Sequence, residues 1–410
     1  MNSSHSNINI ITFPSGLKLV HQSTDREVEY FGASVNAGSR DDPPGQEGLA
    51  HFVEHVIFKG TTHRRSWHII NRMEACGGEL NAYTTKENTV VYTIFPKGNF
   101  LRAADLIADL MCYSTFPASE LDKEREVVAD ELSQYRDIPS EAVFDDFEDY
   151  IFAGSRLGHN ILGNSSALAE FDSETCRNYI EQNFTASRTV IFYSGSRSVK
   201  RVVRDVERLF APLSLRKSLI NRRAPELPPP FHKVENLNNH QANTVTGLVI
   251  PSMFSPRRHA IALLTNILGG PGMNSLLNVE MRERRGLVYT VEASTTLLTD
   301  TGLLSIFFGC DHADTTRCSR IVRSTIGRIA DHGVTPKFLE AAKKQYLGQL
   351  TLASDVRENS VMAMARSTLY YGKVADRQQT AELITSTTAE QIRHEAENIL
   401  SNGLSTLTLE

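Results

Sequence analysis

The chain has 410 residues, of which 40% are hydrophobic and 22% charged, and this length predicts two or three domains because it exceeds what one hydrophobic core usually serves. Its 43 basic and 48 acidic side chains give a net charge of −5 with no basic tail or stripe, which argues against a nucleic-acid partner. The start, MNSSHSNINIITFPSGLKLV, lacks a basic segment followed by an apolar one, and no run approaches about 18 apolar residues. We therefore expect a soluble, cytoplasmic protein that does not enter a membrane.

The five cysteines are odd in number and widely scattered, and none forms a Cys-x-x-Cys pair. This pattern is typical of thiols in a reducing compartment and not of a disulfide framework. A cysteine metal site is not expected. The residues are Cys76, Cys112, Cys176, Cys310 and Cys318.

The first strand-like run, VEYFGASVNAG, is followed by GLAHFVEHVIFKGT, in which apolar residues recur with the spacing of a helix. In a helix, His51 and His55 lie one turn apart on the same face, as two imidazoles must to bind one metal ion. Glu54 borders that face, so it can contact a water on the metal without binding the metal itself. The alternative is an ordinary solvated helix face, although chance predicts His-x-x-Glu-His only about 0.05 times in such a chain.

The next motif, GGELNAYTTKENTVVYTIF, predicts an alternating strand after a glycine pair. A helix is then expected over residues 119–136, where Ser119 and Asp122 resemble a capping box. Glu124 and Glu131 are seven residues apart on one face of it, with Val127 and Val128 between them. Because unpaired carboxylates on an apolar stripe are costly, this helix is the best candidate to supply a third metal ligand. A rim of surface glutamates is the alternative.

A break in composition over residues 214–240, which contain three consecutive prolines, predicts a stiff linker. Residues 1–213 and 241–410 look like weak echoes of each other, since each has strands, a helix, a glycine, further strands and long helices, the last including 336–354. The fold expected is two homologous α+β domains, each an antiparallel-rich sheet with helices packed on one face. Coincidental similarity of short strand patterns is the alternative.

Four segments, GLAHFVEHVIFKGT, GGELNAYTTKENTVVY, EREVVADEL and MRERRGLVYTV, resemble the pitrilysin or insulinase family of zinc peptidases, the inverzincins. The resemblance spans nearly the whole chain and is greatest to the short, two-domain branch that includes mitochondrial processing peptidase and its bacterial relatives. It implies one zinc ion per chain, held by His51, His55 and Glu131, since Glu131 lies at the family's spacing from the second histidine. It also implies that Glu124 supports catalysis without binding the metal.

The chemistry that this resemblance implies is peptide hydrolysis in the first domain. Zinc lowers the pKa of a bound water toward about 7, and Glu54 accepts the proton of that water and passes it to the departing amine. The strand ELNAYTTKENTVVY resembles the family's substrate-binding edge strand, on which Asn81 and Ala82 are the expected contacts. A strand entry after Gly77 and Gly78 needs small polar residues in any case, which is the alternative for these two.

The second domain is expected to help stabilise the oxyanion of the transition state. The family supplies an arginine and a tyrosine there, and Arg282 and Tyr289 occupy the matching positions. Arg284 and Arg285 lie in the same segment, so the assignment to Arg282 rests on spacing, and Tyr289 could simply pack in a strand. Upstream, GGPGMNSLLNVEM departs from the family's usual serine-arginine-leucine run, which puts the shape of the Gly269–Gly272 loop in doubt.

The function expected is a zinc metalloendopeptidase that cuts peptides or unstructured polypeptide segments inside an enclosed chamber. The longer relatives resemble two such chains joined head to tail, so the short branch implies a homodimer in which Arg282 and Tyr289 of one protomer complete the zinc site of the other. Two alternatives stay open. One is a non-catalytic structural subunit, and the other is a processing enzyme that needs a different partner chain.

Overall fold

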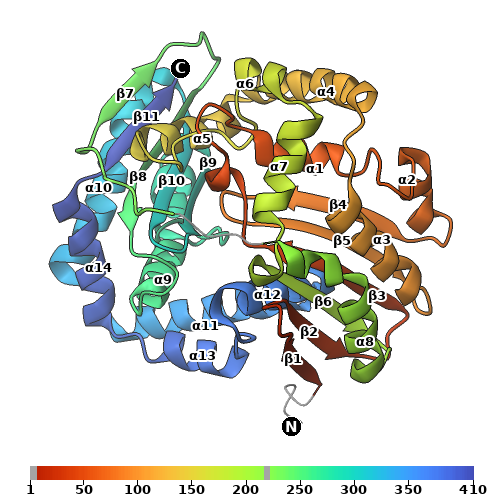
Figure 1. The fold of residues 1–410 in the computed structure, drawn as a ribbon. Coiled ribbons are helices and arrows are strands. Elements are labelled where there is room, and N and C mark those ends of the chain that lie inside the picture. The colour runs from red at the N-terminus through yellow and green to blue at the C-terminus, as the bar shows by residue number, and fades with distance from the viewer. Residues whose placement is uncertain (1–6, 217–221) are drawn as a thin grey trace. The chain divides into compact units, whose positions relative to one another are not determined.

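A computed structural model describes residues 7–216 and 222–410 of the chain, so part of the expected linker, residues 217–221, lies outside the described residues (Figure 1). The chain forms two compact units. Among the described residues, unit 1 consists of 7–133, 160–216, 222 and 356–375, and unit 2 of 134–159, 223–355 and 376–410. The chain thus crosses between units at 222–223, inside the expected linker. Two segments nevertheless belong to the unit that is formed mainly by the other half of the chain: 134–159 lies in unit 2 and 356–375 in unit 1.

Unit 1 contains a six-stranded sheet in the order β1-β2-β6-β3-β5-β4. All neighbours in it are antiparallel except β2 and β6, which are parallel. The strands are β1 (Ile8–Thr12), β2 (Lys18–Ser23), β3 (Val28–Val35), β4 (Glu79–Thr84), β5 (Thr89–Pro96) and β6 (Thr189–Gly195). The longer helices are α1 (Leu49–Val56), α2 (Ser66–Glu74), α3 (Phe100–Tyr113), α4 (Ala118–Arg136, whose last residues join unit 2), α6 (Ser165–Glu170), α7 (Ser173–Asn183), α8 (Val199–Leu209) and α12 (Arg357–Tyr371). Short turns of helix are η1 (Ser39–Asp41), η2 (Ala186–Arg188) and η3 (Ala211–Leu215).

Unit 2 contains a five-stranded sheet in the order β7-β11-β8-β10-β9, again with one parallel pair, β7 and β11. Its strands are β7 (His232–Glu235), β8 (Ala242–Ile250), β9 (Val288–Leu297), β10 (Gly302–Cys310) and β11 (Ser405–Leu409). Its helices are α5 (Pro139–Ile151), α9 (Arg258–Gly269), η4 (Asn278–Glu283), η5 (His312–Asp314), α10 (Thr315–His332), α11 (Pro336–Asp355), α13 (Arg377–Thr385) and α14 (Ala389–Asn402).

The two sheets share one plan. The order β2-β6-β3-β5-β4 corresponds strand for strand to β7-β11-β8-β10-β9, including the position of the parallel pair, and β1 is an addition in unit 1. Helix α1 follows β3 as α9 follows β8, and α7 precedes β6 as α14 precedes β11. The expected pair of α+β domains built on one plan is therefore confirmed.

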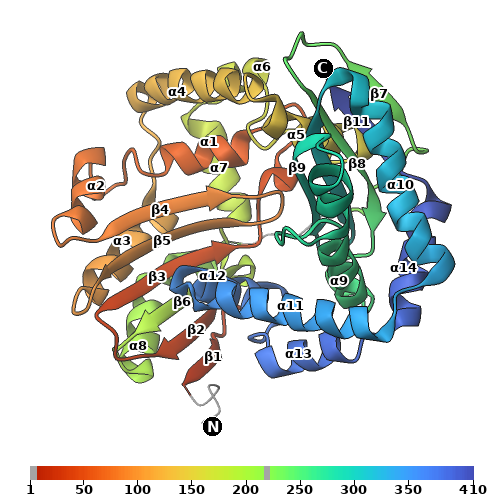
Figure 2. The same ribbon diagram turned by 180° about the vertical axis from the view of Figure 1, so that it is seen from behind.

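Helices cover both faces of each sheet, whereas one face was expected. In unit 1, α1, α3, α7 and α8 pack on one face and α12 packs on the other (Figures 1 and 2). In unit 2, α9, α10 and α14 cover one face and α5 the other. The reason is that central strands are apolar on both sides, as β6 and β10 are buried along their whole lengths, and a sheet of such strands needs two covering layers.

The helix that covers the second face of each sheet comes from the other half of the chain. Helix α12 places Val361, Met364 and Ala365 on the unit 1 sheet, and α5 places Val143 and Phe147 on the unit 2 sheet. This exchange accounts for the discontinuous units.

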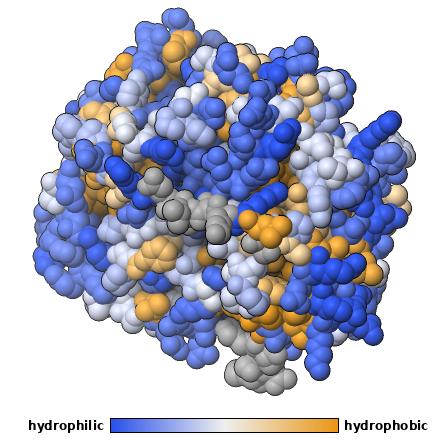
Figure 3. All heavy atoms as spheres, viewed as in Figure 1, coloured by the Kyte–Doolittle hydropathy of each residue, from blue (hydrophilic) through white to orange (hydrophobic). Residues whose placement is uncertain are grey.

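In the view of Figure 3 the surface is mostly hydrophilic, with hydrophobic side chains in small groups. Among the described residues, no helix has the length and apolar character needed to cross a bilayer.

Candidate metal centre

Helix α1 begins where the expected motif begins, and its start is held by groups from the preceding loop. The Asp42 carboxylate accepts hydrogen bonds from the backbone N–H groups of Gly48 and Ala50, both at 2.8 Å, and so supplies the cap that a glycine side chain cannot. Gly48 has a φ of 96°, and a Cβ there would lie 2.6 Å from the Leu162 carbonyl oxygen. Only glycine suits this position.

The buried face of α1 separates the two histidines from the core. Leu49, Phe52, Val53 and Val56 pack into the core of unit 1. His51 and His55 lie on the opposite side with their ring centroids 4.6 Å apart. The apolar spacing read from the sequence thus orients the helix so that both imidazoles face the same space.

Glu131 on α4 reaches the same space from another part of the chain. Its Oε2 lies 3.8 Å from His51 Nε2 and 3.4 Å from His55 Nε2. The three side chains can bring one ligand atom each within 4.8 Å of one another, and they form the one such group of histidine, cysteine or acidic residues in ranges 7–216 and 222–410. Ligands bound at about 2.0–2.1 Å to a tetrahedral ion are about 3.4 Å apart, so these residues fit zinc.

The electrostatics of His51 also suit a ligand. Burial, with a smaller contribution from the neighbouring His55, lowers the pKa of His51 to about 3. Its imidazole is therefore neutral near pH 7 and has a lone pair free to bind a metal. The Nδ1 atom of His51 is buried and has no hydrogen-bond partner among the described residues.

Glu124 lies one layer behind the candidate ligands. Its Oε2 is 3.4 Å from His55 Nδ1, and its Oε1 is 2.6 Å from the Lys59 ammonium. A carboxylate on Nδ1 favours the tautomer that leaves Nε2 free for a metal. Lys59 was not picked out from the sequence, although it lies four residues after His55 in the motif. A basic residue at that spacing, next to a buried glutamate, is the signal that could have found it.

Helix α4 differs in two details from the expectation. It begins at Ala118, and the backbone N–H of Leu121 bonds to the Pro117 carbonyl, so Ser119 lies within the first turn and does not cap the helix. Val128 is buried, but Val127 is 49% exposed. The apolar stripe is therefore narrower than expected, because successive residues in a helix point about 100° apart.

Glu54 lies on α1 next to the end of the edge strand β4. Burial raises the pKa of the Glu54 carboxyl, while polar groups of Thr84 counter part of that rise. A raised pKa brings a carboxylate closer to the working range of a general base. Since Thr84 is the last residue of β4, the strand ends beside the catalytic candidate.

Strand β4 pairs with β5 on one side and forms the edge of the unit 1 sheet among the described residues. Asn81 lies opposite Tyr92 and Ala82 opposite Val91, and both side chains are half-buried. The other backbone edge of β4 can pair with an added strand. Both expected substrate contacts are thus on an edge that leads to Glu54.

Arg282 and Tyr289 belong to unit 2, in η4 and β9, and both are exposed, Tyr289 by 74%. Arg282 differs from the neighbouring arginines in its ion pairing. Arg284 and Arg285 pair with the buried Glu280, at 2.8 Å for Arg284, whereas the Arg282 side chain has no ion pair in the described part of the chain. It is the arginine of this segment that is free to bind another group.

The glycine loop that departs from the family pattern follows α9. A Cβ on Gly269 would lie 2.8 Å from the Ala293 backbone nitrogen, so the glycine lets α9 approach β9 closely. The Asn278 side chain donates to the Met273 carbonyl at 2.5 Å. All five cysteines are free thiols, as expected.

The fold and this site define a two-unit α+β protein with a candidate metal centre at a His-x-x-Glu-His motif. Residues 19–165 match the family model described as Insulinase (Peptidase family M16), and residues 170–346 match the one described as Peptidase M16 inactive domain. The chain belongs to this peptidase family.

Relatives named as zinc proteases cover most of the chain. The uncharacterized zinc protease YmxG of Bacillus subtilis is 30% identical over 367 residues, which are 88% of this chain and 88% of that protein. The uncharacterized zinc protease SCO5738 of Streptomyces coelicolor is 28% identical over 397 residues, 95% of this chain and 86% of that protein.

Solved structures share the fold over nearly the full length. A peptidase M16 inactive domain from Pseudomonas fluorescens has a TM-score of 0.91 at 18% identity and covers 98% of this chain and 97% of its own. A protease from Helicobacter pylori has a TM-score of 0.89 at 16% identity and covers 98% and 99%. At these identities the likeness shows the fold alone.

Proposed function

We propose that this protein is a zinc-dependent endopeptidase that hydrolyses peptides or unstructured polypeptide segments. The observation that carries the proposal is the convergence of Glu131 on both histidine Nε2 atoms, at 3.4 and 3.8 Å, with Glu54 beside them. The zinc protease names of the relatives support the same activity class. A non-catalytic role is less well supported, because such a subunit does not need a complete set of ligands.

The residues of unit 1 have distinct roles in this proposal. His51, His55 and Glu131 would hold the metal, which would supply Lewis-acid activation of water and of the scissile carbonyl. Glu54 accepts the proton of the attacking water at its carboxylate and delivers it to the departing amine. Glu124 orients His55 through Nδ1, and Lys59 neutralises Glu124.

The substrate adds to the edge of the unit 1 sheet. An extended peptide that pairs with β4 gains main-chain hydrogen bonds whatever its sequence, and Asn81 and Ala82 would contact its side chains. Enclosure of the substrate in a chamber would add selection by size. Folded domains should therefore be spared, because their backbone groups are already paired. Efficient cleavage of a rigid folded domain would contradict this part of the proposal.

The direct test compares wild type with Glu54→Gln. The variant should retain about one zinc per chain by mass spectrometry, since Glu54 is not a ligand, and should lose roughly 10²- to 10⁴-fold in the rate of cleavage of an unstructured peptide library. Near-normal turnover by Glu54→Gln would end the mechanism. Zinc binding by a wild-type protein that cleaves nothing would favour the structural-subunit alternative.

We also propose a homodimer whose sites are completed in trans by Arg282 and Tyr289. Support comes from the exposed, unpaired Arg282 side chain on a different unit from the metal ligands. Glu54→Gln and Arg282→Ala proteins, each nearly inactive alone, should regain activity when unfolded and refolded together, to roughly a quarter of wild type if chains assort at random. No recovery in proven mixed dimers would mean that each chain completes its own site or needs a different partner.

A further inference from the structure

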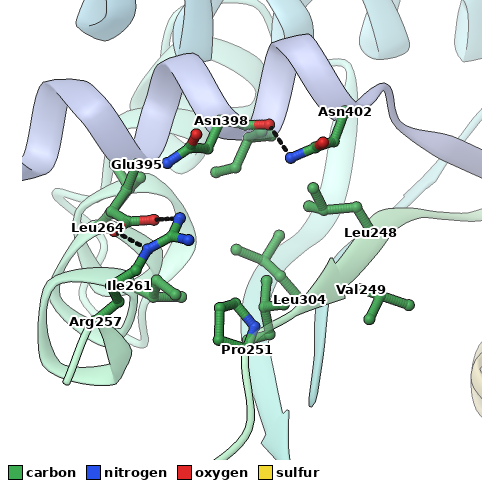
Figure 4. A pocket seen from close by; sticks show the side chains of 12 residues that line it. Leu248, Val249, Pro251, Arg257, Ile261, Leu264, Leu304, Glu395, Asn398 and Asn402 are labelled. Atoms are coloured by element: carbon green, nitrogen blue, oxygen red, sulfur yellow. Dashed lines mark hydrogen bonds and ion pairs between the residues drawn. The ribbon is translucent and has the colours of Figure 1, made fainter. Parts of the chain in front are cut away.

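A cavity of about 200 Å³ lies within unit 2, apart from all the residues discussed above. It is bounded by the end of β8, by β10 and by helices α9 and α14 (Figure 4). Half of the residues that line it are aliphatic side chains of the unit 2 core: Leu248, Ile250, Ile261, Leu264, Leu304 and Ile399. An apolar cavity of about 150 Å³ holds a benzene molecule, so this one has room for a slightly larger guest.

One side of the cavity is polar. The Arg257 guanidinium donates from Nε and Nη2 to the two oxygens of Glu395, at 2.8 and 2.7 Å, which joins α9 to α14. Figure 4 shows this pair on one side, with Leu248, Leu304 and Pro251 across the space. The charges of the pair balance each other, so the cavity has no surplus charge.

One buried donor and one exposed donor on this side have no acceptor among the described residues. Asn398 Nδ2 is buried and has no hydrogen-bond partner among the described residues. Arg257 Nη1 donates to no group in the part of the chain that the structure describes, but this side chain is 43% exposed, so its Nη1 can also bind water. A buried donor without an acceptor, such as Asn398 Nδ2, is destabilising, and a bound acceptor would remove this cost. The aliphatic wall with a few converging donors is the pattern of a small-molecule site.

The corresponding helix of unit 1 carries a large buried side chain. There α7 and α1 take the positions of α14 and α9, and the α7 residue Tyr179 is 2% exposed. Its hydroxyl donates to the Gly38 carbonyl at 3.2 Å. Unit 2 has no tyrosine on α14, so this helix supplies no side chain of that size to the unit 2 core.

We propose that this cavity binds a small, uncharged, branched aliphatic molecule with one acceptor oxygen, the aliphatic end against Leu248 and Leu304 and the oxygen toward Asn398 Nδ2 and Arg257 Nη1. The volume limits the guest to roughly the size of a 3-methylbutyl group with its carbonyl head. A carboxylate head fits less well, because Arg257 is already neutralised by Glu395 and a second anion would be buried without a counter-ion.

The test uses 4-methylpentanamide as probe and needs no peptidase activity. Binding to the full chain is measured by calorimetry and by ligand-observed NMR, beside 4-methylpentanoate, which replaces the amide by a carboxylate, and acetamide, which lacks the branched chain. The amide should bind saturably. Each of the two comparison probes should bind at least about tenfold more weakly than the amide, as expected for the loss of about 1.4 kcal/mol of binding free energy. No saturable binding of the amide, or tighter binding of the carboxylate, overturns the proposal.

Two variants locate the binding. Ile261→Phe fills the cavity and should abolish binding, and Asn398→Leu removes the unpaired donor and should weaken binding about tenfold. His394→Leu is the matched control, because His394 is exposed on the same helix and does not line the cavity. Thermal melts show whether each variant is folded. If one variant fails to fold, the affinity of the other still shows whether the probe binds in this cavity. Unchanged affinity in a folded Ile261→Phe protein would place the probe elsewhere and refute the site.

Discussion

Replacement of Lys59 by methionine tests whether the layer behind the metal ligands matters. Lys59 Nζ lies 2.6 Å from Glu124 Oε1, and the two side chains are only 22% and 12% exposed. Methionine keeps the length of the aliphatic stem and removes the charge. The Glu124 carboxylate then has His55 Nδ1, at 3.4 Å, as its remaining partner among the described residues.

The magnitude follows from the burial of the pair. Removing one partner of a fully buried ion pair costs about 3–5 kcal/mol, and since both of these side chains retain some solvent contact we expect about 2–3 kcal/mol. At about 2–4 °C per kcal/mol, the melting temperature of the metal-free protein should fall by roughly 4–12 °C. Zinc affinity should fall about 10- to 100-fold, because Glu124 would no longer be held against His55.

The assay is a thermal melt of chelator-treated protein together with a competition titration for zinc. Lys97→Met is the control, since Lys97 pairs with the exposed Asp25 at the surface, and it should leave zinc affinity unchanged. If folded Lys59→Met binds zinc within twofold of wild type, the supporting role of Lys59 and Glu124 is refuted.

Three further predictions concern the ligands and the exchanged helix. In a competition titration, the Glu131→Gln variant should lose most of its zinc affinity. Glu126 is exposed on the same helix, so the control variant Glu126→Gln should bind zinc as wild type does. Equal zinc affinities of the two variants would mean that Glu131 is not a ligand. Burial lowers the pKa of His51 in the folded protein to about 3, whereas in the unfolded chain this imidazole binds a proton with a pKa near about 6.5. The free energy of unfolding should therefore fall as pH drops below about 6.5, by about 1.4 kcal/mol per pH unit. Metal-free His51→Phe should show less of this loss in denaturant melts between pH 7 and 5, and an identical pH dependence would contradict the assignment. Tyr92→Phe removes a 2.6 Å hydrogen bond to Glu358 of α12 and should lower the free energy of unfolding by about 1.5–3 kcal/mol, whereas an unchanged value would mean that this bond does not anchor α12.

Local periodicity determined much of this protein. The apolar spacing around His51 and His55 predicted a helix that the structure places at Leu49–Val56. The expected helices 119–136 and 336–354 correspond to Ala118–Arg136 and Pro336–Asp355. Such predictions succeed because the side chains on one face of a helix are set by the repeat of 3.6 residues, which needs no knowledge of distant segments.

The residue pattern alone could not show whether Glu124 or Glu131 is the third metal ligand. Both glutamates share one face of α4, and spacing along that helix treats them alike. Tertiary packing of α4 near α1 brings Glu131 to the Nε2 atoms and Glu124 to His55 Nδ1, so one can bind metal and the other can orient a ligand. The family resemblance pointed to the same assignment.

Long-range packing alone decided the remaining features. Nothing in the local pattern of residues 357–371 shows that this helix covers the unit 1 sheet, because its apolar face would suit either sheet. Lys59 contacts Glu124 across 65 positions of sequence, and the unit 2 cavity depends on side chains from α14 and β8 that are about 150 residues apart. Such contacts depend on how helices and strands pack together in the folded protein. Hydrophobic periodicity shows which face of an element is buried, but it does not show which other element packs against that face.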